Sequence, residues 1–141
     1  MKRVLLLMVF AAGAACAADR AGWWAQVEHT IRNYIGKPYV WGASGMKSFD
    51  CSGFVWRVLL DNGVLIKRTT ARKLYFSLPE ARAGGDWLPG DIVFFDDLRH
   101  CGIVNTRSDF FHAGTSTGIT CARFDPVWRP KVVGLRRIVV P

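Results

Sequence analysis

Cys51 is the residue of this sequence best suited to act as a nucleophile. It stands between the polar residues Asp50 and Ser52 and ahead of Gly53, directly before the apolar run 54–60. That run predicts a buried helix with Cys51 in its first turn. Unpaired N–H groups at a helix N-terminus lower the pKa of a thiol and favour the reactive thiolate. The sequence therefore predicts thiol chemistry at Cys51, with a small buried hydrophobic cysteine as the alternative.

A catalytic thiol needs a base within hydrogen-bond reach and a third group that orients this base. The sequence contains three histidines, His29, His100 and His112. His29 falls on the polar side of an amphipathic segment, where we expect it to be solvated. His100 and His112 belong to consecutive apolar segments, and an antiparallel hairpin would place them roughly opposite one another. This pair could supply a base and its orienting partner, or two hydrogen-bonded residues at a sheet edge.

A zinc site is the competing use of the same part of the chain. His100, Cys101, His112 and Cys121 are potential ligands. Adjacent strand residues point to opposite faces, so His100 and Cys101 would not share one ion. Cys101 and Cys121 are expected on strands separated by a third strand, which is too far for a disulfide. We therefore expect no metal, no other cofactor and two inert buried thiols.

The hydrophobic period changes from helical to strand-like near Leu88. The expected helices run from an N-cap at Asp19 to about Gly36, from Cys51 to Leu60, and over 71–78 after an N-cap in Thr69-Thr70. The expected strands are 92–95, 101–104, 110–112, 119–124 and 132–140, with a polar turn over 105–109. Helices followed by antiparallel strands describe an α+β domain.

Length and composition limit the classes of protein that fit. The chain has 141 residues, is 50% hydrophobic and carries 19 Lys and Arg against 11 Asp and Glu, a net charge of +8. This excludes a disordered tail and favours one domain with its own core. The basic residues are scattered and no recognition motif accompanies them, so we expect no nucleic-acid partner.

Residues 1–18 have the pattern of an export signal. A basic start precedes the unbroken apolar run 4–10, and small residues follow. The run is too short to span a bilayer, so we expect cleavage that leaves residues 19–141 as the domain. Lipidation of Cys16, as in bacterial lipoproteins, is the alternative and the only route by which a membrane is expected as a partner. Both routes lead to the cell envelope, in the periplasm or outside the cell.

Seven short motifs follow one another along the chain. They are Tyr39-x-Trp41-Gly42, Asp50-Cys51-Ser52-Gly53, Arg68-Thr69-Thr70, Leu88-x-Gly90-Asp91, His100-x-Gly102, Phe111-His112-Ala113 and Val133-Gly134. In this order they resemble the NlpC (p-sixty) family of bacterial cell-wall cysteine peptidases, over about residues 31–139. The resemblance implies a papain-like α+β domain, with N-terminal helices packed on an antiparallel sheet of about five strands. It also implies hydrolysis of the bond from D-glutamate to the diamino acid of peptidoglycan stem peptides.

The resemblance assigns a role to each matching residue near the thiol. Cys51 matches the nucleophile, His100 the general base and His112 the third catalytic residue. Tyr39 matches a tyrosine beside the thiol that aids the oxyanion.

The resemblance also predicts substrate contacts. Asp50 and Ser52 match the positions that hold the amine end and the D-glutamate carboxylate of the substrate. Thr70 matches a pocket position where a small hydroxyl residue is common. Cys101 departs from the family, because it stands where valine is common, but no catalytic group is missing.

Two other functions remain open at this point. The same thiol could transfer an acyl group to an amine or lipid acceptor, or act as an amidase on another envelope substrate. The domain could also be a non-catalytic basic module that binds an anionic envelope polymer. Residues 19–141 leave no room for a second module that would wall off the pocket, so we expect a monomer with an open groove that accepts cross-linked wall.

Overall fold

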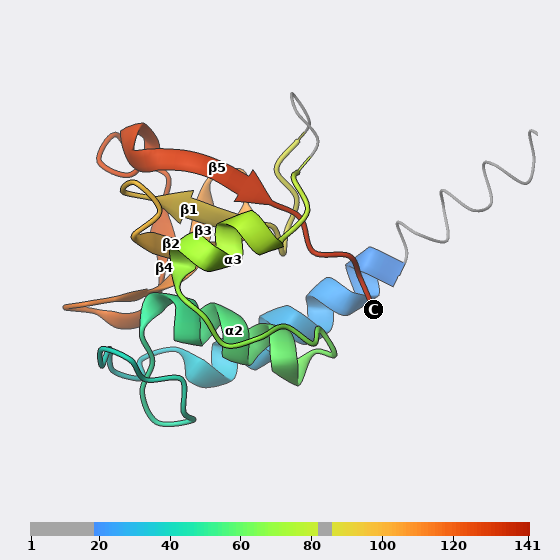
Figure 1. Ribbon diagram of the computed structural model, residues 1–141, viewed down its shortest axis with the longest axis horizontal. Coiled ribbons are helices and arrows are strands. Elements are labelled where there is room, and N and C mark those ends of the chain that lie inside the picture. Colours follow the sequence, from blue (N-terminus) through green and yellow to red (C-terminus); the bar gives the residue numbers. More distant parts are fainter. Residues whose placement is uncertain (1–18, 82–85) are drawn as a thin grey trace, which may run out of the picture.

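The α-helices precede the strands along the chain in the computed structural model, which describes residues 19–81 and 86–141 (Figure 1). An N-terminal helix covers residues 19–34, α2 spans Cys51–Asp61 and α3 spans Ala71–Ser77. Asp19 is already helical, so its prediction as the N-cap was wrong. The apolar stripe of this helix begins only at Trp23, a full turn after Asp19, and therefore did not show that Asp19 is helical. The predicted export signal, including Cys16, lies outside the described residues.

Side-chain caps fix where α2 and α3 begin. Asp50 has extended backbone, with φ −90° and ψ −178°, and its carboxylate accepts a hydrogen bond from the Gly53 N–H at 2.6 Å. The Thr70 hydroxyl accepts from the Lys73 N–H at 3.3 Å, which confirms the predicted cap of α3. Such caps satisfy N–H groups that the first helical turn leaves without partners. The Asp50 cap makes Cys51 the first residue of α2.

One antiparallel sheet follows the helices. Its strands are β1 (Ile92–Phe95), β2 (His100–Thr106), β3 (Asp109–Gly114), β4 (Gly118–Arg123) and β5 (Val132–Arg136). They lie in the order β4-β3-β2-β1-β5, so the predicted α+β class with about five antiparallel strands is confirmed. β5 ends at Arg136 rather than residue 140, because its pairing with β1 ends where Ile92, the first residue of β1, faces Arg136. The β2–β3 turn is tighter than predicted, because Thr106 already pairs with Asp109.

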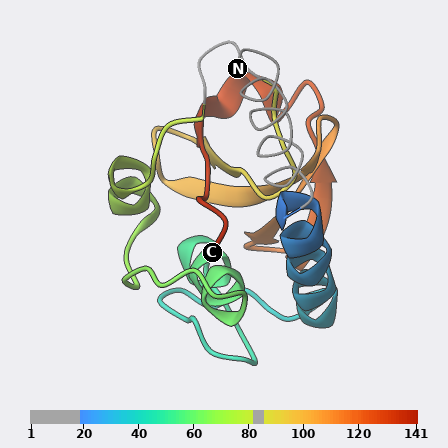
Figure 2. The same cartoon turned by 90° about the vertical axis from the view of Figure 1, so that its right-hand side faces the viewer.

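The helices cover one face of the sheet. Phe94, Ile103 and Phe111 point to that face and pack with buried residues of the N-terminal helix and α2 in the main core. Phe95 and Phe110 point to the opposite face, where they form a second aromatic cluster with Phe124. Figures 1 and 2 show the N-terminal helix and α2 on the same side of the sheet. Since both faces of β1 are covered, all four of its residues are buried.

Within residues 19–81 and 86–141, no helix is both long enough and apolar enough to cross a membrane.

Candidate active site

Cys51 lies where the start of α2 meets the start of β2. Its side chain is nearly buried, with 8% of the residue exposed. The Sγ atom lies 3.8 Å from the carbonyl oxygen of Arg99, which accepts a hydrogen bond from Cys51 when the thiol is protonated. Arg99 directly precedes His100, the first residue of β2. The fold therefore brings the predicted nucleophile and the predicted base to one place, although 48 residues separate Cys51 from Arg99 in sequence.

His100 and His112 are in hydrogen-bond contact across β2 and β3. The Nε2 atom of His100 lies 2.9 Å from the Nδ1 atom of His112, and the two rings are perpendicular. Ile103 pairs with Phe111, so His112 faces Gly102 and the histidines are diagonal neighbours rather than directly opposite. The expectation that the two histidines lie close together across the hairpin is confirmed, with an offset of two residues between them. A Cβ atom at Gly102 would lie 2.6 Å from the Phe111 carbonyl oxygen, so glycine permits this close approach.

Aromatic packing surrounds the histidine pair. The Trp128 ring centroid lies 5.0 Å from that of His112 and 5.6 Å from that of His100. Burial, with a smaller contribution from the neighbouring His100, lowers the pKa of His112 from 6.5 to about 4. His112 is therefore a neutral imidazole at neutral pH. His29, by contrast, is exposed on the N-terminal helix, as predicted.

The thiol of Cys51 is strongly acidified. A hydrogen bond from the Cys101 side chain lowers the pKa of Cys51 the most; burial opposes this effect, and His100 adds to it through a hydrogen bond and its charge. Together they lower the pKa of Cys51 from 9.0 to about 5. The same contact and complete burial raise the pKa of Cys101 well above its usual range. One of the two sulfurs is therefore a thiolate at neutral pH, and it belongs to Cys51.

The expectation of two buried thiols is confirmed for Cys101, which is fully buried, and was wrong for Cys121. Cys121 is exposed, because it lies on β4, an edge strand of the sheet whose side chains alternate between partly buried and exposed over residues 120–123. Cys51, Cys101 and Cys121 are all free.

Two hollows meet at Cys51 and Tyr39. The larger, of about 740 Å³, is lined by His100, His112 and Trp128 as well as by polar residues of the β3–β4 turn. The smaller, of about 460 Å³, is lined by the predicted substrate residues Asp50, Ser52 and Thr70, together with Arg68 and Leu98. The geometry thus places all seven predicted site residues around one groove with the thiol at its middle.

Asp50 is already engaged in several internal contacts. Its Oδ1 atom accepts from the Gly53 N–H at 2.6 Å and from Arg68 at 2.9 Å, and lies 3.3 Å from the Ser52 hydroxyl. Its Oδ2 atom accepts from the Gly42 N–H at 3.0 Å. A carboxylate oxygen can accept two hydrogen bonds, so Oδ2 retains capacity for a further donor.

Arg68 also lines the groove, although the sequence alone assigned it no role. Its guanidinium contacts Asp50 and donates to the Ser52 hydroxyl at 3.0 Å. The side chain remains 28% exposed in the smaller hollow. The only signal in the sequence was its place in the Arg68-Thr69-Thr70 motif, because nothing in the sequence indicated that a residue 18 positions after Asp50 would lie against it.

Tyr39 lies at the junction of the two hollows. Burial raises the pKa of Tyr39, and the negative charges of Cys51 and Asp50 raise it further. Its phenol therefore stays protonated and can donate a hydrogen bond towards the groove.

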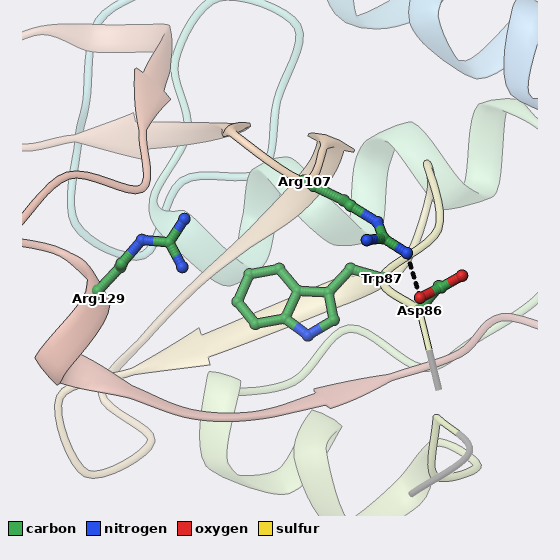
Figure 3. Close-up of a pocket in the computed structure, with 4 residues that line it drawn as sticks. All are labelled: Asp86, Trp87, Arg107 and Arg129. Carbon is green, nitrogen blue, oxygen red and sulfur yellow. Dashed lines mark ion pairs between the residues drawn. The ribbon is translucent and has the colours of Figure 1, made fainter. Parts of the chain in front are cut away.

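A separate hollow lies away from this groove. It is lined by Asp86, Trp87, Arg107 and Arg129, with Asp86 and Arg107 forming an ion pair (Figure 3). None of the seven predicted site residues lines it. In the described ranges, no group of three His, Cys, Asp or Glu side chains is arranged to hold a metal ion.

The sequence also shows which protein family this chain belongs to. The sequence pattern of the NlpC/P60 family matches residues 36–137. The chain belongs to the NlpC/P60 family. The family resemblance noted in the motifs is thereby confirmed.

Named relatives and solved structures agree with this membership. The chain is 33% identical over 115 residues to the probable endopeptidase NlpC of Escherichia coli, covering 77% of this chain and 73% of that protein. It is 33% identical over 107 residues to the probable peptidoglycan endopeptidase LytE of Bacillus subtilis, covering 73% of this chain but only 31% of LytE. A lipoprotein-like NLP/P60 family structure from Staphylococcus aureus superposes with a TM-score of 0.72 at 26% identity, over 84% of this chain and 42% of that one.

Proposed function

We propose that this domain is a peptidoglycan hydrolase, a cysteine endopeptidase that cleaves the D-glutamyl–diamino acid bond of stem peptides. The observation that carries the proposal is the hydrogen-bonded His100–His112 pair beside an acidified Cys51 at a helix N-terminus. Membership of the NlpC/P60 family and the endopeptidase names of its relatives support the reaction and the substrate class.

The histidine pair supports a defined path for the proton. His112 is neutral, so its Nδ1 atom can accept the Nε2–H of His100 across 2.9 Å. This hydrogen bond leaves the Nδ1 atom of His100 as the nitrogen available to Cys51. His100 is then the general base, and His112 fixes its tautomer and orientation, as the third member of a catalytic triad does.

Cys51 gives its proton to the Nδ1 atom of His100 and attacks the carbonyl carbon of the scissile bond as a thiolate. The developing oxyanion is stabilised by the Cys51 N–H at the start of α2 and by the protonated Tyr39 phenol. The carbon–nitrogen bond then breaks, and the leaving amine takes its proton from His100. Water, deprotonated by His100, hydrolyses the thioester and restores the thiol.

The position of His100 supports an assignment of the two halves of the groove. His100 and His112 line the larger hollow and not the smaller one, and the general acid must lie beside the leaving amine. We therefore assign the diamino acid to the larger hollow and the acyl half, ending in D-glutamate, to the smaller one. There Asp50 Oδ2 receives the amine end, while Ser52, Thr70 and the cationic Arg68 receive the carboxylate.

The setting of the enzyme follows from the same proposal. We propose export by way of residues 1–18 and action on the wall as a monomer in the cell envelope. A membrane is a partner only if Cys16 is lipidated. No nucleic acid or cofactor takes part.

Mass spectrometry of products from defined muropeptides tests the proposal. We expect one product that ends in D-glutamate and one that begins with the diamino acid. Cys51→Ala and His100→Ala abolish the reaction with the fold intact, and His112→Ala weakens it less. His29→Ala is the matched control and keeps full activity, because His29 is exposed and lines neither hollow of the groove.

Two outcomes would contradict the proposal. Hydrolysis that survives Cys51→Ala would exclude the thiol mechanism. An amide formed with an added amine acceptor, in place of the hydrolysed product, would show that the enzyme is an acyltransferase.

A further inference from the structure

The turn between β1 and β2 contributes two charged side chains to the wall of the larger hollow. They are Asp96 and Arg99, and both are exposed. Among the described residues that line this hollow, Asp96 is the only carboxylate and Arg99 the only arginine or lysine. The proposed mechanism uses neither charged group. The hollow therefore carries one negative and one positive charge that catalysis does not require.

Backbone hydrogen bonds hold both residues in place. The Asp96 N–H donates to the Lys131 carbonyl at 3.0 Å, and the Asp96 carbonyl accepts from the Arg99 N–H at 3.1 Å. The Nε atom of Arg99 donates to the same carbonyl at 3.3 Å. Within residues 19–81 and 86–141, the Asp96 carboxylate and the Nη atoms of Arg99 form no hydrogen bond or ion pair. The charged ends of both side chains are therefore available to a ligand in the hollow.

We propose that Asp96 and Arg99 form the subsite for the side-chain end of the diamino acid, where Asp96 binds the ammonium group and Arg99 binds a carboxylate on the same carbon. The inference rests on the proposed assignment of the diamino acid to the larger hollow. A lysine side chain ends in an ammonium group alone, whereas a diaminopimelate side chain ends in an ammonium group and a carboxylate. Arg99 therefore selects stem peptides that contain diaminopimelate.

The chemistry of the two side chains matches these two groups. A guanidinium binds a carboxylate through paired N–H donors, and the Nη atoms of Arg99 remain as donors once Nε is engaged. Arg99 also lines the smaller hollow, which is assigned to D-glutamate. A contact with D-glutamate would strengthen the binding of every stem peptide equally. A contact with the diamino acid strengthens the binding of only the peptide that has the additional carboxylate.

Isothermal titration calorimetry on the Cys51→Ala variant tests the inference, because this variant binds a peptide without cleaving it. The probes are the tetrapeptides L-Ala–γ-D-Glu–X–D-Ala with diaminopimelate or lysine as X, which differ only in the additional carboxylate. We expect the diaminopimelate peptide to bind about five times more tightly. Adding Arg99→Gln brings the ratio of the two Kd values to about one. Adding Asp96→Asn weakens both peptides about threefold and keeps the ratio, because both carry the ammonium group.

Matched controls come from charged residues outside the groove. Asp97 belongs to the same turn and Arg123 lies on β4; both are exposed and line neither hollow. Asp97→Asn and Arg123→Gln should leave both Kd values unchanged. If Arg99→Gln is unfolded by circular dichroism, the ionic-strength dependence in Cys51→Ala alone decides. There the preference for diaminopimelate falls towards one between about 0.02 and 0.5 M salt, because salt screens exposed charges.

The outcomes separate this inference from the proposed function. Equal Kd values for the two peptides in Cys51→Ala, or no binding of either, would overturn the inference. So would a preference that survives Arg99→Gln, or an equal loss of both peptides in that variant, which would place Arg99 on a carboxylate that both share. Unchanged binding in Asp96→Asn would remove Asp96 from the subsite. Failure of the parent enzyme to hydrolyse either tetrapeptide would overturn the proposed function and leave the binding result standing.

Discussion

Replacement of Asp50 tests how far the fold and the active site depend on one carboxylate. Asp50 caps α2 through Oδ1, pairs with Arg68 and accepts the Gly42 N–H through Oδ2. Asp50→Asn keeps an oxygen for the cap but places an amide NH₂ group opposite the Gly42 N–H. Asp50→Ala removes all three contacts.

The contacts of Asp50 allow the size of the effect to be worked out. Asparagine is nearly as good an N-cap as aspartate, so the cap contributes little to the loss in Asp50→Asn. Gly42 is exposed, so water can replace the lost acceptor, and its hydrogen bond is worth about 0.5–1.5 kcal/mol; the partly exposed Arg68 pair is worth about 1 kcal/mol or less. Asp50→Asn therefore lowers the free energy of unfolding by about 0.5–2.5 kcal/mol. Asp50→Ala also loses the cap, at about 1 kcal/mol more.

Urea denaturation followed by tryptophan fluorescence measures both losses. Asp125→Asn is the matched control, because Asp125 is exposed and keeps its oxygen for the N–H groups of Val127 and Trp128. We expect its free energy of unfolding to stay within about 0.5 kcal/mol of the parent. If Asp50→Asn is as stable as the parent, the contacts with Gly42 and Arg68 do not support the site. If Asp50→Ala and Asp50→Asn are equally unstable, the cap contributes nothing.

Three further substitutions test other parts of the structure. The pKa of His112 is about 4 in the fold against 6.5 outside it, so the unfolded chain binds more protons and stability falls as pH drops from 6.5 towards 4. His112→Asn should lose about 2 kcal/mol less than the parent between pH 7 and pH 4.5 in urea titrations. Arg68→Lys should raise KM for muropeptide about tenfold with little change in kcat, while Arg72→Lys in the same hollow should change neither. Asp91 is fully buried between two arginines, so Asp91→Asn should destabilise the fold by about 3–5 kcal/mol in thermal denaturation.

Local patterns in the sequence predicted most of the elements. Apolar spacing and capping residues marked α2 and α3, because caps satisfy backbone groups within a few residues of one another. Short apolar runs marked β1 to β4, since strands buried on one or both faces need such runs. The end of β5 was missed because it is set by the length of β1, a partner 40 residues away in sequence.

Contacts between distant segments were the part of the site that the sequence did not show. Spacing alone suggested a histidine pair, but the diagonal register and the 2.9 Å contact depend on the turn between β2 and β3. The effect of Cys101 on Cys51 and the contact of Arg68 with Asp50 arise only when the sheet packs on α2. The exposure of Cys121 likewise depends on its place in an edge strand.

The turn between β1 and β2 shows how packing decides a geometry that local preference opposes. Asp96, Asp97 and Leu98 have φ values of 50°, 54° and 66°, the left-handed region that costs a residue other than glycine about 1 kcal/mol or more. Leu98 is held because its side chain is 7% exposed and packs in the main core. Asp96 is held because its N–H donates to the Lys131 carbonyl at 3.0 Å and its carbonyl accepts from the Arg99 N–H at 3.1 Å. This conformation places the Arg99 carbonyl against Cys51 and starts β2 at His100. The packing of Leu98 in the core therefore stabilises the strained turn that positions the base.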